Sequence, residues 1–397
     1  MHKIDAPGAT AGNEFTDGDI GSGIPPTQMW SKWANTIQRE LVAVVQAAGL
    51  TLSDVDDTQL LQAINLIRPG LGLRNRIQNG DFRFWQRTGA EGGDLPASVT
   101  TTDALLPDRW YCRAGSTGGS ATVNRQAFTL GQTDVPGEPT YYLEWIQSVA
   151  SSGLFPRLIT PIENVRTMAG QTVTLSWWAR VTSGTLPIQP KIVQDFGAGG
   201  SADVIQTETS QVATTTWQRF YFDVTLPSIT GKTIGTDHYL GAALELVGVS
   251  WTGTLQLADI QLEPGSTPTV FERIPDFLML EMLERFYEKT YEPDEKPGKS
   301  GAGLGPIVYW DPTWPSWPAL QGIFRVRKYM PAAAVAAVPY DFTGGAAGTI
   351  LFGGTQYPST MGNSTSTMTG QPTVGGSPPN GRNLASCHYT ADHEIPL

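Results

Sequence analysis

The stretch TVTLSWWARV, residues 172–181, decides the fold class because apolar and polar side chains alternate along most of it. In an extended chain, successive side chains point to opposite faces. One face would carry Val173, Leu175, Trp177, Ala179 and Val181, and the other Thr172, Thr174, Ser176, Trp178 and Arg180. This pattern predicts a β-strand with one face in a core.

Several other stretches repeat the pattern. TWQRFYFDVTL (216–226) alternates in the same way, and YYLEWIQ (141–147), YLGAALEL (239–246) and TLQLADIQL (254–262) read as further strands. Glycine (44) and proline (29) supply many turns between them. We therefore expect a mainly β protein, with a central antiparallel sandwich over residues 73–275.

Composition excludes several classes of protein. A chain of 397 residues suggests two or three domains. The net charge of −11 comes without a basic cluster, which argues against nucleic-acid binding. The sequence contains no run of about 18 apolar residues, so we expect no membrane insertion. The first residues also lack the apolar core of a signal peptide. Cys112 and Cys387 lie far apart without a CxxC pattern, so we expect two inert thiols in a protein made in a reducing cytosol.

Residues 1–72 form a first region with two expected helices. After Pro26, the apolar residues Trp30, Trp33, Ile37 and Leu41 recur at helical spacing, and a second helix is expected over 57–67. Two short helices bury too little apolar surface to be stable alone. We therefore expect this region to fold in an oligomer or against a larger assembly, with an independent two-helix unit as the alternative.

Residues 276–397 form the third region, which opens with an expected helix over 276–289. One stripe on that helix holds Phe277, Leu280, Leu283 and Tyr287, and a second holds Met279, Met282 and Phe286. So wide an apolar surface suits a helix buried on two sides, as at an oligomer axis. Short strand candidates follow at 306–310, 322–329 and 347–354, which predicts a small β-rich tip domain.

The order of these pieces resembles tail fibre proteins of tailed bacteriophages. The carrying motifs in the first region are MHKIDAPGATAGNEFTDGD, RELVAVVQAAGLTL and DDTQLLQAI. Those in the second are IQNGDFRFWQR (77–87), DRWY (108–111), LSWWARV, TTTWQRFYFDV and LADIQLEPGSTPTVFERI (257–274), which look like a carbohydrate-binding-module-like jelly roll. In this interpretation, residues 77–87 start the sandwich, with Phe82 and Phe84 on one face and Arg83 and Trp85 on the other.

The resemblance implies a homotrimeric fibre of the phage tail, located in the virion and made in the host cytoplasm. Residues 1–72 would attach to baseplate or tail proteins. Residues 290–397 would form the tip that binds a bacterial surface glycan, pilus or outer-membrane protein. Three copies would give avidity to weak contacts.

Four residues on the more polar faces of two central strands suit sugar binding, which needs aromatic rings beside groups that bond hydroxyls. They are Trp178, Arg180, Tyr221 and Asp223. The alternative is that a long loop or a neighbouring subunit covers them.

The resemblance also implies a structural calcium, the one cofactor considered. Such modules often hold it between their start and their last strand, here at Asn79, Asp81 and Asp259, with Glu263 as a further ligand. The closing strand has ADI where the family has paired acids, and fewer carboxylates weaken calcium binding.

Two features of the third region stand out. YWDPTWPSWP (309–318) places Trp310, Trp314 and Trp317 in a backbone stiffened by proline, which suits either a receptor-contacting loop or a packed plug. Near the C-terminus, Cys387, His388 and His393 would offer metal ligands in three copies around an axis, against an ordinary strand end.

Enzyme signatures are scarce. GAGLGP (301–306) lacks the Lys-Ser/Thr of a phosphate loop, and no GxSxG stretch occurs. We expect a binding protein without catalysis. The alternatives are a tail-associated polysaccharide depolymerase, whose acidic pair would be visible only in three dimensions, and a purely structural fibre whose receptor another tail protein reads.

Overall fold

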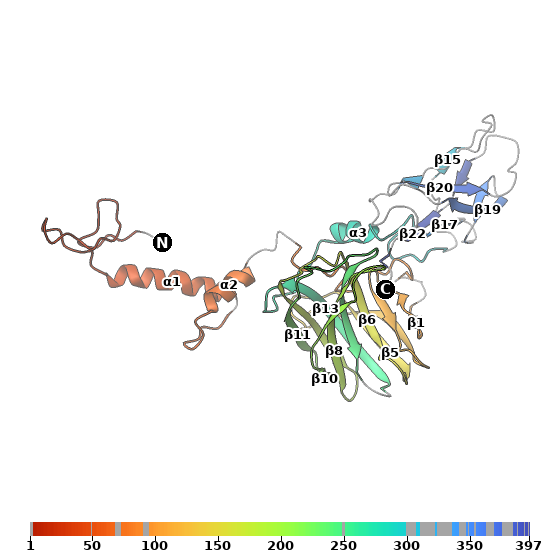
Figure 1. Ribbon diagram of the computed structural model, residues 1–397, viewed down its shortest axis with the longest axis horizontal. Coiled ribbons are helices and arrows are strands. Elements are labelled where there is room, and N and C mark those ends of the chain that lie inside the picture. The colour runs from red at the N-terminus through yellow and green to blue at the C-terminus, as the bar shows by residue number, and fades with distance from the viewer. Residues whose placement is uncertain are drawn as a thin grey trace. The chain divides into compact units, whose positions relative to one another are not determined.

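The computed structural model of the chain describes residues 3–48, 50–67, 73–89, 95–247 and 251–298. Beyond these it describes short segments at 307–309, 322–323, 336–340, 347, 349–352, 355–362, 369–374, 384–386, 388–392, 394–395 and 397. The chain divides into two compact units, residues 1–72 and 73–397. Figure 1 shows the elements of both.

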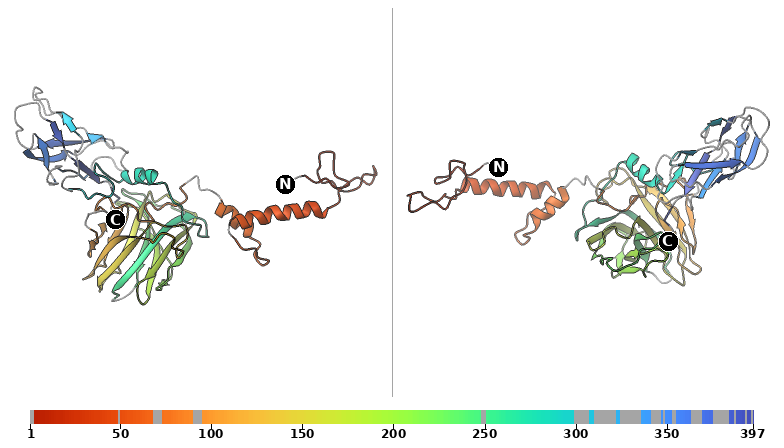
Figure 2. Two further views of the ribbon diagram at one scale, coloured as in Figure 1. Left: turned by 180° about the vertical axis from the view of Figure 1, so that it is seen from behind. Right: turned by 45° about the horizontal axis from the view of Figure 1, so that its top comes forward.

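The first unit contains helices α1 (Ser31–Ala47) and α2 (Gln59–Ile67), as the sequence predicted. Two further views show these helices and the loop between them (Figure 2). Trp33 packs edge-on against Phe15, with ring centroids 4.8 Å apart, and Val45 is buried. Two of the predicted apolar residues remain exposed: Trp30, which precedes α1, at 40% and Leu41 at 43%. An apolar surface therefore remains uncovered on this unit. Among the described residues, no helix is both long and apolar enough to cross a membrane.

The second unit is built on a sandwich of two antiparallel sheets. The first sheet has the order β1 (Ala97–Val99), β4 (Ser120–Ala127), β5 (Tyr141–Val149), β13 (Gly253–Pro264), β7 (Thr172–Val181), β11 (Gln218–Thr225). The second has the order β10 (Gln211–Ala213), β8 (Leu186–Asp195), β12 (Tyr239–Leu246), β6 (Arg157–Glu163), β3 (Tyr111–Arg113), β2 (Ala104–Leu105), and β9 (Val204–Thr207) pairs with β8. The predicted mainly β fold is confirmed, and the sheet order is compatible with a jelly roll.

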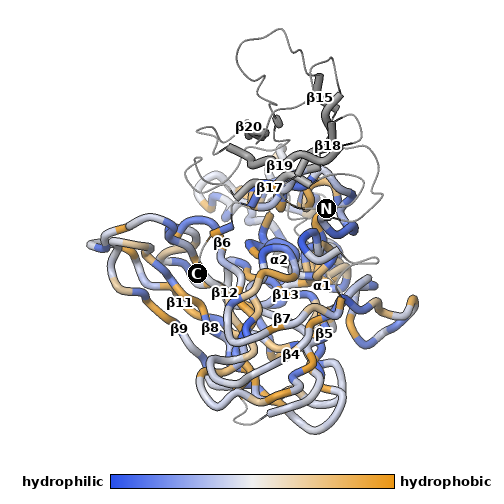
Figure 3. Tube along the Cα trace, turned by 90° about the vertical axis from the view of Figure 1, so that its right-hand side faces the viewer, coloured by the Kyte–Doolittle hydropathy of each residue, from blue (hydrophilic) through white to orange (hydrophobic). Residues whose placement is uncertain are grey.

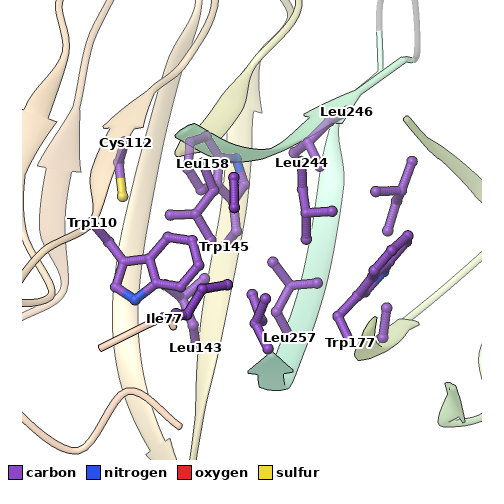
Figure 4. Close-up of a cluster of buried hydrophobic side chains, with 14 of the residues drawn as sticks. Ile77, Trp110, Cys112, Leu143, Trp145, Leu158, Trp177, Leu244, Leu246 and Leu257 are labelled. Atoms are coloured by element: carbon purple, nitrogen blue, oxygen red, sulfur yellow. The ribbon is translucent and has the colours of Figure 1, made fainter. Parts of the chain in front are cut away.

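The core lies between the two sheets. Leu255 and Leu257 of β13 meet Leu240 and Leu244 of β12 in one apolar cluster, which also holds Trp177. Figure 4 shows part of this cluster, with Trp110, Trp145 and Trp177 among its large side chains. Figure 3 colours the chain by hydropathy, with hydrophobic residues in orange. Along β8, buried and half-buried residues alternate, so this strand turns one face toward the core. Burial of this surface is the main force that holds the sandwich together.

The stretch Ile77–Arg87 does not form the first strand, so that interpretation was wrong. The chain turns here, with positive φ angles of 55° at Asn79 and 56° at Phe82. The Asn79 side chain donates to the carbonyls of Phe84 and Asp108 and accepts from the Phe84 N–H. Such local side-chain bonds compete with strand pairing.

The turn changes which aromatic side chains share a side of the chain. Phe82 and Trp85 both enter the core, whereas Phe84 packs beside Ile274 and Met279. The predicted alternation, with Phe82 and Phe84 on one face and Trp85 on the other, is therefore wrong. Phe82 and Trp85 share the core, and Phe84 lies in a different cluster.

The predicted helix over 276–289 is shorter in the structure. α3 covers Asp276–Glu284, and Tyr287–Lys289 forms strand β14, which pairs with β22 (His388–Asp392). Tyr287 is therefore not on the helical stripe expected to line a trimer axis, because its strand pairs with the returning chain. Met279 and Leu283 are buried in a small apolar cluster with Ile274, and Phe84 packs against this cluster. Phe277, on the same helix, is 74% exposed.

Ion pairs fasten β22 and the residues after it to the sandwich. Arg87 pairs with Asp392 at 3.0 Å and with Glu394 at 3.5 Å, and Arg109 also pairs with Glu394. The Tyr111 hydroxyl donates to the Ile395 carbonyl at 2.7 Å. The two predicted motifs at 77–87 and 108–111 thus hold the end of the chain.

The remaining described strands belong to the third region of the sequence. They are β15 (Ile307–Tyr309), β16 (Gly322–Ile323), β17 (Ala336–Tyr340), β18 (Thr349–Phe352), β19 (Thr355–Gly362), β20 (Thr369–Val374) and β21 (Leu384–Ser386). β17 also pairs with β22. Trp310, Trp314, Trp317, Cys387 and His393 lie outside the described residues, as does the His388 side chain.

Candidate functional site

The face of the first sheet that points away from the core, here called the outer face, carries the best candidate for a binding site. Strand register brings four polar side chains into one row across four strands. Asn124 of β4 lies opposite Glu144 of β5, Glu144 opposite Gln256 of β13, and Gln256 opposite Arg180 of β7. Strands about 4.8 Å apart make this polar row roughly 14 Å long.

Hydrogen bonds connect most of the polar row. Arg180 Nε donates to Gln256 Oε1 at 2.6 Å, and Gln256 Nε2 donates to Glu144 Oε2 at 2.8 Å. Gln126 Nε2 donates to the other oxygen of Glu144 at 3.0 Å. A network of this kind holds its members in fixed orientations.

An aromatic cluster of Phe128, Tyr142 and Trp217 lies beside the polar row. Its ring centroids are 4.8 Å apart for Phe128 and Tyr142, 5.4 Å for Phe128 and Trp217, and 5.8 Å for Tyr142 and Trp217. The guanidinium of Arg180 lies 5.1 Å from the Trp217 ring centroid. Burial raises the pKa of the Tyr142 hydroxyl, and the Glu144 carboxylate adds to this rise.

The four predicted sugar-binding residues are spread along the paired strands β7 and β11. Arg180 and half-buried Trp178 lie on β7 beside the aromatic cluster. Tyr221 and Asp223 are exposed on the edge strand β11, opposite Ser176 and Thr174. Asp223 therefore sits about 20 Å along the strands from Arg180, at about 3.4 Å per residue.

A loop covers the far end of the outer face. The segment 265–274 follows β13, and within it Thr269 accepts a hydrogen bond from Arg219 through its carbonyl. The Glu272 N–H donates to Gln261 Oε1 at 2.8 Å. Ser176 is 1% exposed as a result of this packing. The loop buries Ser176 but leaves Tyr221 and Asp223 exposed, and the polar row lies at the other end of the face.

Asp81 and Asp259, two of the predicted calcium ligands, do come together, but arginines accompany them. Arg273 lies 2.9 Å from Asp259 and 3.7 Å from Asp81, and Arg83 lies 2.6 Å from Asp81. The Asn79 oxygen already accepts the Phe84 N–H. Guanidinium groups supply positive charge here, and among the described residues no group of three or more His, Cys, Asp or Glu side chains is arranged for a metal ion. Calcium binding stays an untested prediction.

Glu263, the further calcium ligand considered, is engaged elsewhere, because its carboxylate pairs with Arg74 at 2.9 Å. Cys112 is buried as a free thiol, and burial raises its pKa.

Sequence reasoning missed most of the polar row and the aromatic cluster. Glu144 and Tyr142 lie on a predicted strand, YYLEWIQ, where alternation places them opposite Leu143 and Trp145. That signal was available. The pairing of Glu144 with Gln256, more than 100 residues later, depends on strand register and has no local signal.

Matches to known proteins come from solved structures. No protein-family model matches the chain, and a search of curated proteins finds no match. Solved structures that match include a CBM4 module, 19% identical over 48% of this chain and 99% of that chain, with a TM-score of 0.29. A family 22 carbohydrate binding module of Clostridium thermocellum Xyn10B is 16% identical over 48% of this chain and 97% of that chain, with a TM-score of 0.29.

A phage protein is also among the similar structures. The enzymatically active domain of bacteriophage CBA120 tailspike protein 4 is 12% identical over 48% of this chain and 22% of that chain, with a TM-score of 0.31. Because all of these TM-scores are below 0.5, the sheet order and register described above carry the fold assignment.

Proposed function

We propose that the chain is a carbohydrate-binding protein of a phage tail, which attaches the virion to a glycan on the bacterial surface without cleaving it. The observation that carries the proposal is the polar row of hydrogen-bonded side chains beside the aromatic cluster. Sugars present apolar CH faces that stack on rings and hydroxyls that bond to amides, carboxylates and guanidinium groups. Both kinds of partner lie together, with the polar row on four neighbouring strands and the aromatic cluster on β5 and next to the ends of β4 and β11.

The virion location is supported by the resemblance of the sequence to tail fibres. The same resemblance supports a homotrimer, in which residues 1–72 attach to baseplate or tail proteins. The exposed apolar residues Trp30 and Leu41 fit such a docking role, because large exposed apolar surfaces commonly mark interaction sites. Trp310, Trp314 and Trp317 remain candidate receptor contacts of the tip, for a glycan, pilus or outer-membrane protein.

Glycan binding is tested with the full chain and immobilised surface polysaccharide of the host bacterium. Trp217→Ala should weaken binding by about 5- to 150-fold, because stacking of a ligand ring on an aromatic side chain is worth roughly 1–3 kcal/mol where it has been measured for nucleobases. Ile205→Ala on β9, where the side chain is 55% exposed, is the control. Thermal unfolding of both variants checks that the sandwich stays intact.

Two outcomes would reject the proposal. If Trp217→Ala folds and binds as the unaltered chain does, the outer face is not the site. If reducing ends accumulate when the chain is incubated with the polysaccharide, the protein is a depolymerase. Competition between the purified chain and virions for adsorption to the host then tests the attachment role, and its absence would favour a purely structural fibre.

A further inference from the structure

Most hydrogen-bond donors of the Arg180 guanidinium have no partner within the described part of the chain. Its Nε donates to Gln256, which leaves the two terminal nitrogens. A guanidinium has five N–H donors, so four of them belong to those terminal nitrogens. Within the described part of the chain, Arg180 has no ion pair and no further hydrogen bond, whereas Arg157 pairs with Asp103 at 2.9 Å and Arg285 with Glu163 at 2.6 Å.

The arrangement of the polar row keeps Arg180 unpaired. Its neighbour across the row is the amide of Gln256, and the acidic Glu144 comes one strand later. No ion pair joins Arg180 to Glu144, because the amide of Gln256 lies between the guanidinium and the carboxylate. Gln256 bonds to both and is only 4% exposed, so it fixes this separation.

The guanidinium is also held in place before any ligand arrives. Its Nε bond fixes one edge, and the Trp217 ring lies 5.1 Å from its central carbon. Fixing a long side chain in advance reduces the entropy lost on binding. A planar fork of donors that is held in this way matches the two oxygens of a carboxylate or phosphate.

We propose that the ligand of this face is an acidic glycan, whose carboxylate or phosphate group binds the terminal nitrogens of Arg180. The inference rests on the proposed carbohydrate-binding function and names its substrate class. Glu144 accepts hydrogen bonds from neighbouring sugar hydroxyls, since each of its oxygens has one amide partner and a further lone pair. The aromatic cluster lowers the local dielectric constant and strengthens the contact between the anion and Arg180.

The chain as a whole carries a net charge of −11, which repels polyanions at long range. Selectivity for acidic glycans therefore depends on the local contact at Arg180. Removing that one positive charge should abolish the selectivity, and an equal change elsewhere should not.

The experiment measures binding of the full chain to matched pairs of polysaccharides. Polygalacturonate, alginate and hyaluronate are each paired with their carboxyl-reduced form, and phosphomannan is paired with its dephosphorylated form. We expect at least a tenfold preference for the acidic member of one pair, and the pair that shows it identifies carboxylate or phosphate. Arg180→Gln should remove the preference, and Arg180→Lys should keep only part of it because lysine lacks the planar fork.

Arg166→Gln, an exposed site in the turn after β6, makes the same change of charge and should leave the preference intact. Equal binding to both members of every pair would overturn the inference and leave the proposed function standing. If none of the eight polymers binds and the host polysaccharide does not bind either, both fall. An unchanged preference in Arg180→Gln would also overturn the inference.

Discussion

Glu263 is a charged side chain with no exposed surface, and it connects the closing strand to the loop that follows. Its Oε1 accepts from Gln261 and from the Thr269 N–H at 2.8 Å each. Its Oε2 accepts from the Thr269 hydroxyl at 2.5 Å and lies 2.9 Å from Arg74 Nε. A buried carboxylate is tolerated only when it is paired and hydrogen-bonded in this way.

Replacing this side chain should therefore be costly. We expect Glu263→Ala to lower the free energy of unfolding by about 3 kcal/mol, because Arg74 and the Thr269 N–H lose their partner. Urea unfolding followed by tryptophan fluorescence measures the change. Asp223→Ala, an exposed carboxylate of the same sheet, should change it by less than about 0.5 kcal/mol. Equal effects of the two substitutions would contradict this account of Glu263.

Asp259 gives the sandwich a pH dependence. Burial raises the pKa of its carboxyl to about 7, Arg273 opposes the rise, and the Asp81 carboxylate adds to it. In the unfolded chain an aspartate has a pKa of about 3.9, so the folded state binds a proton more readily. The stability that this group contributes is therefore complete below about pH 4 and is lost as the pH rises through about 7.

Asp259→Asn removes this titration and tests its sign. The difference in unfolding free energy between the variant and the unaltered chain should move in favour of the variant between about pH 4 and about pH 8. Urea unfolding at several pH values in this range measures it. A difference that stays constant with pH would show that Asp259 does not titrate there.

Helix α3 carries a buried and an exposed apolar residue within one turn, which allows a matched comparison. Met279 is 3% exposed and packs with Ile274 and Leu283, whereas Phe277 is 74% exposed. We expect Met279→Ala to lower the free energy of unfolding by about 2–3 kcal/mol, the usual cost of a large-to-small change in a core.

Phe277→Ala is the matched control on the same helix. It should leave the unfolding free energy within about 0.5 kcal/mol, as expected for an exposed position. Light scattering on this variant also tests the predicted trimer helix. If the chain is a trimer and Phe277 lies at its axis, the trimer of the variant should be weaker and should dissociate at a higher protein concentration than the unaltered trimer. Unchanged assembly would remove Phe277 from the trimer contact.

Elements with a simple period were predictable from the sequence, and elements shaped by side-chain bonds were not. Alternation in residues 172–181 predicted β7 because period two is a local property of a strand. Residues 77–87 alternate too, yet the Asn79 side chain bonds the backbone at Phe84 and turns the chain. The helix expected to continue to Lys289 ends at Glu284, because residues 287–289 pair with a strand about 100 residues later.

The candidate site shows the same division. Trp178 and Arg180 were found because they alternate with core residues of β7. Glu144 and Gln256 complete the polar row only through antiparallel register between β5 and β13. Register follows from how whole sheets bury their apolar faces, so no short stretch contains it.

At the scale of the whole second unit, the third region of the sequence leaves and rejoins the sandwich at adjacent strands. β14 and β22 pair directly, with Tyr287 opposite Asp392 and Lys289 opposite Thr390. Arg87 and Arg109, with side chains 13% and 2% exposed, hold the carboxylates after this pairing. The residues between the two strands are thus an insertion whose two ends are fixed together on the sandwich.

Two deletions separate the insertion from its anchor. Replacing residues 299–386 with a short Gly-Ser linker keeps β14, β22, Asp392 and Glu394. Its sandwich should unfold cooperatively and nearly as stably as the unaltered chain, since loop length has a weak effect on stability. Ending the chain at residue 298 removes Asp392 and Glu394 and leaves the two buried guanidinium groups without these partners. This form should lose about 3–5 kcal/mol or fail to fold, because a buried charge is left uncompensated. Urea unfolding monitored by tryptophan fluorescence compares the two, and equal stability would mean that the returning strand does not support the sandwich.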